Sequence, residues 1–139
     1  MSKAKLLRIA SVLAAPALVL GLGTQASAYS GDQWVDLVDS GSPVGIAASM
    51  YHVDNGDHFR VYDFHADGHG VRGHLQIFDA RQGGWVEVHS SYNGKGAGKY
   101  TEFTYNVLST KQYRMKVCTA DGIEDSTPVR CSKYYTFSE

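Results

Sequence analysis

The chain has 139 residues and a formal net charge of −1, from 13 basic and 14 acidic residues. It contains no block of like charges. Phosphate binding depends on clustered cations, so this composition argues against nucleic acid or an anionic membrane as the main partner.

Residues 1–28 differ in composition from the rest of the chain. Lys3, Lys5 and Arg8 form a basic head, an apolar run covers residues 9–22, and Ala26-Ser27-Ala28 supplies the small residues that signal peptidase requires. The apolar run is shorter than the roughly 20 residues that span a bilayer, and no charged stop-transfer segment follows. We therefore predict a cleaved signal peptide over residues 1–28 and one secreted, extracellular domain over residues 29–139, with no membrane contact after cleavage.

Removing the predicted leader leaves 111 residues, enough for one domain and too few for two. The leader holds three of the 13 basic residues and no acid, so residues 29–139 carry 10 basic and 14 acidic residues, a net charge of −4. Cys118 and Cys131 are the only cysteines. In an oxidising compartment an even count predicts a disulfide, and the spacing lacks the paired clusters of a structural zinc site.

Short alternating runs follow the leader, separated by Gly, Asn and Asp, while helical periodicity is almost absent. About seven strands predict an all-β fold, a single small antiparallel β-sandwich of fibronectin type III or immunoglobulin-like character, with a small barrel as the alternative. The segment 29–42 is either an edge strand or a flexible terminal arm that pairs with the sheet edge of a partner, and we favour the edge strand. The expected strands cover residues 33–38, 46–52, 58–63, 71–78, 85–90, 99–108, 113–117 and 129–137.

Residues 103–122 resemble the tyrosine-corner region of fibronectin type III and related sandwiches. Leu108 precedes Tyr113 by five residues, and Met115 and Val117 continue the alternation. The resemblance implies that the Tyr113 hydroxyl group bonds to the backbone upstream. Cys118 and Cys131 would then lie on neighbouring strands of the last hairpin, and closing that loop stabilises the fold by roughly 3 kcal/mol.

Three runs resemble small secreted proteins of Streptomyces-type actinobacteria: residues 54–63 (DNGDHFRVYD), 66–70 (ADGHG) and 117–122 (VCTADG). The resemblance implies an extracellular location and a sandwich fold, and it transfers no catalytic residue. Secreted sandwiches of such organisms include connecting subunits of umbrella-shaped antibacterial toxin particles. A toxin-particle subunit is therefore one expectation for this chain.

The segment 54–74 is rich in aspartate and histidine. Its carboxylates are ligands of the kind that Ca²⁺ takes, but the order of an EF-hand is missing, and the same residues favour turns. Its histidines suggest zinc or copper, although a four-residue spacing on strands or loops does not bring two side chains together. We favour turn formation and no cofactor, with Ca²⁺ as the alternative. The candidate metal ligands are Asp54, Asp57, Asp63, Asp67, His65 and His69.

Exposed tyrosine and tryptophan side chains are typical of recognition surfaces. Strand alternation predicts Phe59, Phe103 and Tyr113 in the core. It leaves a candidate partner surface of Trp34, Tyr62, Tyr92 and Tyr100.

The expected function is therefore non-enzymatic binding of another extracellular protein. The sequence shows no Gly-x-Ser-x-Gly or His-Glu-x-x-His motif. One alternative is a carbohydrate or cell-wall binding module that uses the exposed aromatic residues. The other is a small hydrolase or metal-dependent enzyme that uses the region from Asp54 to His74.

Overall fold

A computed structural model describes residues 31–139, so the predicted signal peptide lies outside the described residues. The regular structure in this part consists of β-strands. Residues 31–139 hold no helix of the length and apolarity that crossing a membrane requires. The strands are β1 (Gln33–Val38), β2 (Ile46–Val53), β3 (His58–Asp63), β4 (Gly70–Asp79), β5 (Gly84–Asn93), β6 (Lys99–Thr104), β7 (Tyr113–Ala120) and β8 (Tyr135–Phe137).

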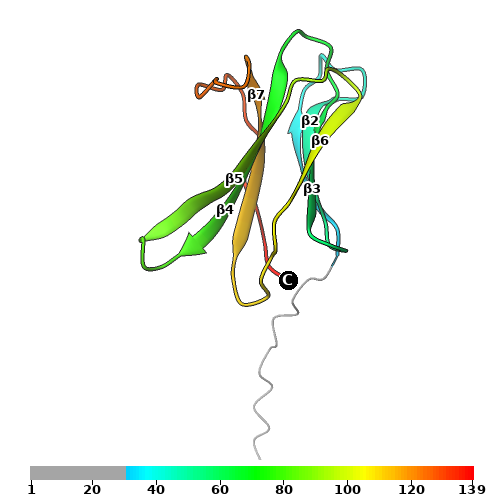
Figure 1. Cartoon of the computed structure of the whole chain (residues 1–139). Helices are drawn as coiled ribbons and strands as arrows, with labels where there is room; N and C mark the ends of the chain where they lie inside the picture. Colours follow the sequence, from blue (N-terminus) through cyan, green and yellow to red (C-terminus); the bar gives the residue numbers. More distant parts are fainter. Residues whose placement is uncertain (1–30) are drawn as a thin grey trace, which may run out of the picture.

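The eight strands form two antiparallel four-stranded sheets that face each other (Figure 1). One sheet has the order β1-β2-β3-β6 and the other β5-β4-β7-β8. Strands β2, β3 and β6 share one sheet and β4, β7 and β8 share the other, as strands A, B, E and C, F, G do in immunoglobulin-like sandwiches. Strand β5 instead joins β4 in the second sheet, and β1 is an additional edge strand. The predicted all-β sandwich with one disulfide is confirmed.

The core lies between the sheets because side chains alternate between the two faces of each strand. In β3, Phe59 and Val61 are fully buried, while the alternate residues His58, Arg60 and Tyr62 are half-buried on the outer face. Phe103 packs against this core from β6 and is partly buried. The largest buried apolar side chains are Tyr113, Phe59, Met50, Leu75, Met115, Val61 and Val117.

The tyrosine corner is present. The backbone N–H of Leu108 donates a hydrogen bond of 3.2 Å to the Tyr113 hydroxyl oxygen. The strand predicted over residues 99–108 ends earlier, at Thr104. It ends there because the next backbone N–H groups leave the sheet: Tyr105 N donates to the Asp57 carbonyl (3.1 Å) and Val107 N to the Asp57 carboxylate (2.8 Å).

Cys118 and Cys131 form the predicted disulfide. The long last strand expected over residues 129–137 is wrong, because only Tyr135–Phe137 pairs as a strand and Cys131 makes an isolated bridge to Cys118. The preceding residues are held by other contacts. The Arg130 carbonyl accepts a hydrogen bond from Thr119 N (2.9 Å), and its guanidinium group donates across the sandwich to the Asp39 carboxylate (2.6 Å).

The connections between strands gather at two opposite ends of the sandwich (Figure 1). The loop end carries residues 39–45, 64–69, 94–98 and 121–134, which connect strands at the top of Figure 1. The turn end carries residues 54–57, 80–83 and 105–112. The rigid sheets thus present four loops at one end, where binding residues are commonly placed.

Candidate functional site

The predicted metal ligands do not form one group. Asp54 and Asp57 lie in the β2–β3 turn at the turn end, whereas Asp63, His65, Asp67 and His69 follow β3 at the loop end. The six-residue strand between them spans about 20 Å. Whatever each group does, the two groups act separately.

At the turn end, Asp57 fixes the corner of the fold. One of its carboxylate oxygens lies 3.1 Å from His52 Nε2, and the other accepts the bond from Val107 N. Glu139 lies beside this pair, and its pKa is raised by burial and by the charges of Asp57 and Asp54. One ligand atom each from His52, Asp57 and Glu139 lies within 4.8 Å of the others. Both Asp57 oxygens already have partners, which favours a structural role.

His52, which is not among the predicted site residues, is a polar core residue. It is 1% exposed, and its ring stacks on Phe59 (4.6 Å between centroids) and packs against Phe137 (5.2 Å). Its position on the inner face of β2, two residues after Met50, is the signal that predicts this burial. The ring therefore belongs to the core, with its Nε2 directed at Asp57.

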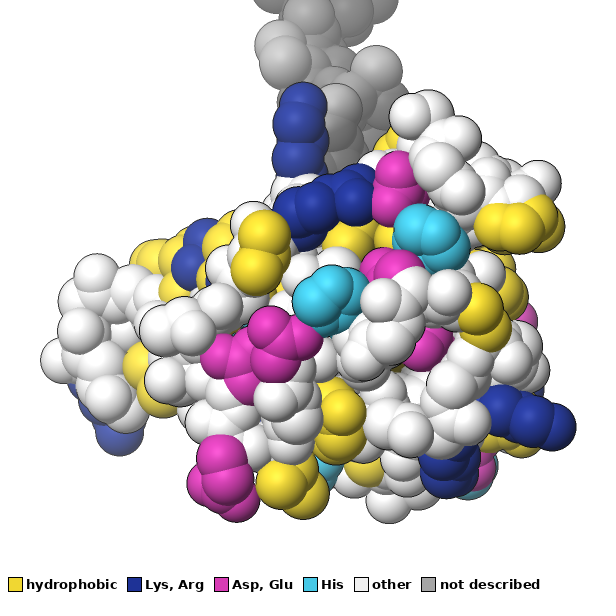
Figure 2. Space-filling view, turned by 90° about the horizontal axis from the view of Figure 1, so that it is seen from above, with side chains coloured by type: hydrophobic (Ala, Val, Ile, Leu, Met, Phe, Trp, Pro, Cys, Tyr) yellow, Lys and Arg dark blue, Asp and Glu magenta, His cyan; other side chains and the backbone are white. Residues whose placement is uncertain are grey.

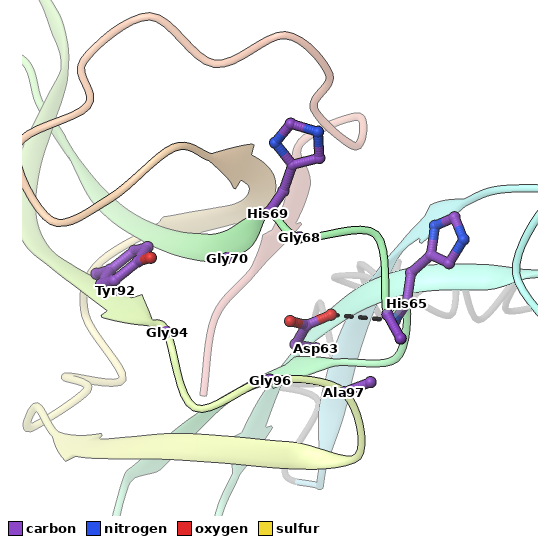
Figure 3. A pocket seen from close by; sticks show the side chains of 10 residues that line it. Asp63, His65, Gly68, His69, Gly70, Tyr92, Gly94, Gly96 and Ala97 are labelled. Atoms are coloured by element: carbon purple, nitrogen blue, oxygen red, sulfur yellow. Dashed lines mark hydrogen bonds between the residues drawn. The ribbon is translucent and has the colours of Figure 1, made fainter.

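The loop end is hollowed. A depression of about 350 Å³ lies between the β3–β4 and β5–β6 loops, lined by Asp63, His65, His69, Tyr92 and several glycines. Figure 2 looks onto this end and shows histidine and acidic side chains next to one another. Figure 3 shows the lining residues, with the Asp63 side chain between the two loops.

Asp63 is the buried acid of this depression, which we call the loop-end hollow. It is 1% exposed and occupies the last inward-facing position of β3. One carboxylate oxygen accepts a 3.0 Å bond from His65 N, and the other has no partner among residues 31–139. Burial raises the pKa of Asp63, the His65 amide opposes that rise, and the charge of Asp67 adds to it.

The two histidines of the hollow pair with loop carboxylates and their rings point away from Asp63 (Figure 3). His65 Nδ1 lies 3.3 Å from Asp67 and 3.4 Å from Asp39. His69 pairs with Asp121, which raises the pKa of its imidazole. The histidines therefore do not converge on one point, as a zinc or copper site requires.

Tyr92 does not lie with the other predicted partner residues, because its strand, β5, belongs to the second sheet. Its ring fills the space that two glycines leave open. A Cβ atom at Gly70 would lie 2.5 Å from the Tyr92 hydroxyl oxygen, and one at Gly94 would lie 2.7 Å from the ring. Tyr92 is thus a wall of the hollow.

Asn93, the last residue of β5, lies beyond the strand predicted over residues 85–90 and is fully buried. Its side-chain amide donates to the carbonyl groups of Val61 (3.0 Å) and Lys99 (2.8 Å), and its oxygen accepts from Lys95 N (3.0 Å). These bonds connect the two sheets and set the path of the β5–β6 loop. Asn93 therefore shapes one rim of the hollow.

The outer face of the β1-β2-β3-β6 sheet carries three of the four predicted partner residues and one that was missed, Tyr51. Trp34 and Tyr51 face each other across β1 and β2, and Tyr62 and Tyr100 do so across β3 and β6. Successive ring centroids are 6.2, 5.4 and 4.8 Å apart. We call Trp34, Tyr51, Tyr62 and Tyr100 the aromatic row. Its ends are the most exposed, with Trp34 at 54% and Tyr100 at 41%.

Comparison of the chain with models of protein families, with curated proteins and with solved structures found no match.

Proposed function

We propose that this chain is a secreted, non-enzymatic binding protein that engages another extracellular protein through the aromatic row. The observation that carries the proposal is a line of four aromatic side chains, one from each strand of a sheet, with half-exposed residues at both ends. Tryptophan and tyrosine supply contact area together with a polar tip, and they dominate the energetic centres of protein interfaces.

The surroundings of the aromatic row fit the polar rim of a protein interface. Arg60 lies 5.3 Å over the Tyr100 ring and pairs with Glu102 at 2.6 Å, so this guanidinium group is held in place at the surface. On the other side, Ser49 donates a hydrogen bond to Asp36. Fixed polar groups around aromatic residues lose little conformational entropy on binding.

A carbohydrate partner fits this geometry less well. Sugar rings bind by lying flat on exposed aromatic faces, which favours coplanar rings that face the solvent. In the aromatic row, Trp34 stacks on Tyr51 at an interplanar angle of 24°, and Tyr51 meets Tyr62 edge to face at 70°. Neighbouring rings therefore cover part of each other's faces and do not share a plane.

A metal-dependent enzyme centred on residues 54–74 gains no support, because those residues are divided between the two ends of the sandwich. A toxin-particle subunit remains one form that the proposed role can take, and the mass of the complex distinguishes it from a binary pair.

The test compares wild type and the double variant Trp34→Ala/Tyr100→Ala, each secreted by cells of the source organism. Size-exclusion chromatography with light scattering gives the mass of each secreted species. We expect wild type in a complex of defined stoichiometry and the double variant as a monomer. Loss of an aromatic interface centre weakens affinity about 30-fold or more.

Phe78→Ala is the matched control, since Phe78 is 42% exposed but lies in β4 of the opposite sheet. It should leave the complex intact. A wild-type monomer would contradict a stable complex. If that monomer were retained on insoluble polysaccharide, and the double variant were not, the carbohydrate alternative would replace the proposal.

A further inference from the structure

The unpartnered oxygen of Asp63 is the feature of the loop-end hollow that its own contacts do not explain. A buried carboxylate oxygen without a hydrogen-bond donor is costly, and folded proteins rarely retain one. The other oxygen of the same group is already used by His65 N. We propose that the loop-end hollow is a binding site for a primary ammonium group, with the Asp63 carboxylate as its counter-ion.

The positive groups near the hollow are directed elsewhere. Lys95 Nζ donates to the Tyr100 carbonyl at 3.0 Å, and the Arg72 guanidinium group donates to the Ile123 carbonyl. Lys99 stands opposite Asp63 in the β3–β6 register, yet no ion pair joins the two. No lysine or arginine of the described chain therefore forms an ion pair with this carboxylate.

The walls suit a narrow alkylammonium chain. Glycine lines both loops, and Gly68 and Gly96 have positive φ angles of 84° and 87°, with open space where a Cβ atom would lie. Without side chains at these positions, a ligand can approach the backbone closely. The Tyr92 ring supplies an apolar wall for the methylene groups that follow the ammonium nitrogen.

A divalent cation fits this set of donors less well than an ammonium group. Ca²⁺ takes six to eight oxygen ligands. The nearby acids Asp39 and Asp67 are paired with His65, and one Asp63 oxygen is occupied. The single free carboxylate oxygen can accept one of the three N–H donors of a primary ammonium group in a charge-assisted hydrogen bond.

The proposal does not depend on the aromatic row, and its test uses different probes. The protein, labelled with ¹⁵N, is titrated with n-butylammonium chloride while the backbone amide signals of His65, Gly68 and Gly96 are followed by NMR. We expect saturable shifts of these signals. n-Butanol has the same chain without the charge and should give none. Tetramethylammonium has the charge without an N–H donor and should bind at least tenfold more weakly.

Asp63→Asn should weaken n-butylammonium binding about tenfold or more. Asp67→Asn is the matched control, because it removes a neighbouring charge that is paired with His65, and it should change the affinity by no more than about threefold. Trp34→Ala should leave it unchanged. The thermal midpoint of each variant reports whether the fold is retained, and the comparison of the three probes on wild type needs no variant at all.

A primary ammonium group in a natural ligand can belong to a protein lysine or to an amino sugar. Titration with Nα-acetyl-lysine amide tests the first source, and titration with glucosamine tests the second. Tighter binding of either one supports an ammonium site and assigns its source. The proposal is overturned if n-butylammonium gives no saturable shift at the hollow, if n-butanol matches it, or if a folded Asp63→Asn protein binds it as wild type does.

Discussion

The hydroxyl group of Tyr113 joins two parts of the chain that no strand ladder connects. Its ring is fully buried and packs against Phe137 at 5.9 Å between centroids, so the hydroxyl group is held at the corner where the chain crosses between sheets. There it accepts the hydrogen bond from Leu108 N. Burial also raises the pKa of Tyr113, which keeps the group neutral over the physiological range.

Tyr113→Phe should therefore lower the free energy of unfolding by about 1 kcal/mol, because the backbone N–H of Leu108 loses its partner. Urea denaturation followed by fluorescence measures the change. Tyr105→Phe is the control, since its hydroxyl group has no hydrogen-bond partner among residues 31–139, and it should cost less. Equal losses in both variants would mean that the corner bond contributes nothing specific.

At the scale of the element, β4 has one position that must lack a side chain. Gly73 faces inward where β4 crosses the opposite sheet. A Cβ atom there would lie 2.5 Å from a Val61 methyl group and 2.9 Å from the Met50 sulfur. Both neighbours are fully buried and have no free space to move into. The distance between the two sheets is thus set partly by this glycine.

Gly73→Ala should cost about 1–3 kcal/mol of unfolding free energy, as overpacking of a filled core does. The measurement is chemical denaturation monitored by circular dichroism. Gly41→Ala, at a loop position where a new Cβ atom would make an ordinary 3.4 Å contact, should stay within about 0.5 kcal/mol of wild type. A neutral Gly73→Ala would show that the sheets can separate at no cost.

For the whole molecule, the disulfide holds the long irregular segment between β7 and β8 against the second sheet. The double variant Cys118→Ala/Cys131→Ala should lose about 3 kcal/mol, because a closed loop of this length restricts the unfolded chain by that amount. Wild type in reductant should show the same loss in urea denaturation. If the double variant unfolds at the wild-type midpoint, the Arg130 and Thr119 contacts alone must hold the segment.

The strands that the sequence predicted well are those whose signals are local. Alternation and glycine or asparagine turns placed Gln33–Val38 and His58–Asp63 at their observed bounds. The errors lie where distant residues decide the backbone path. Asp57 ends β6 by accepting the backbone N–H groups of Tyr105 and Val107, and the Arg130 side chain is bound to Asp39 of the other sheet's edge while its carbonyl group is bound to Thr119 N of β7.

The same distinction applies to the candidate sites. The alternation of side chains along each strand correctly predicted that Trp34, Tyr62 and Tyr100 face outward. Alternation does not say which sheet a strand joins, so Tyr92 was grouped with them although its strand belongs to the other sheet. The loop-end hollow forms because the β3–β4 and β5–β6 loops, about 30 residues apart in sequence, lie next to each other in the fold. Asp63 was predicted as a metal ligand because it is an aspartate. That one of its oxygens is buried without a hydrogen-bond partner follows from the packing of the folded chain and has no signal in the sequence.

Both ends of the described chain lie at the turn end. Gln33 pairs with His52, just before the β2–β3 turn, and Glu139 lies beside Asp57 in that turn. The loop-end hollow is therefore about 20 Å away, the length of the six-residue strand β3. When the protein is attached to a sensor chip or fused to a display scaffold through either end, the sandwich itself acts as a rigid spacer that projects the hollow into solution.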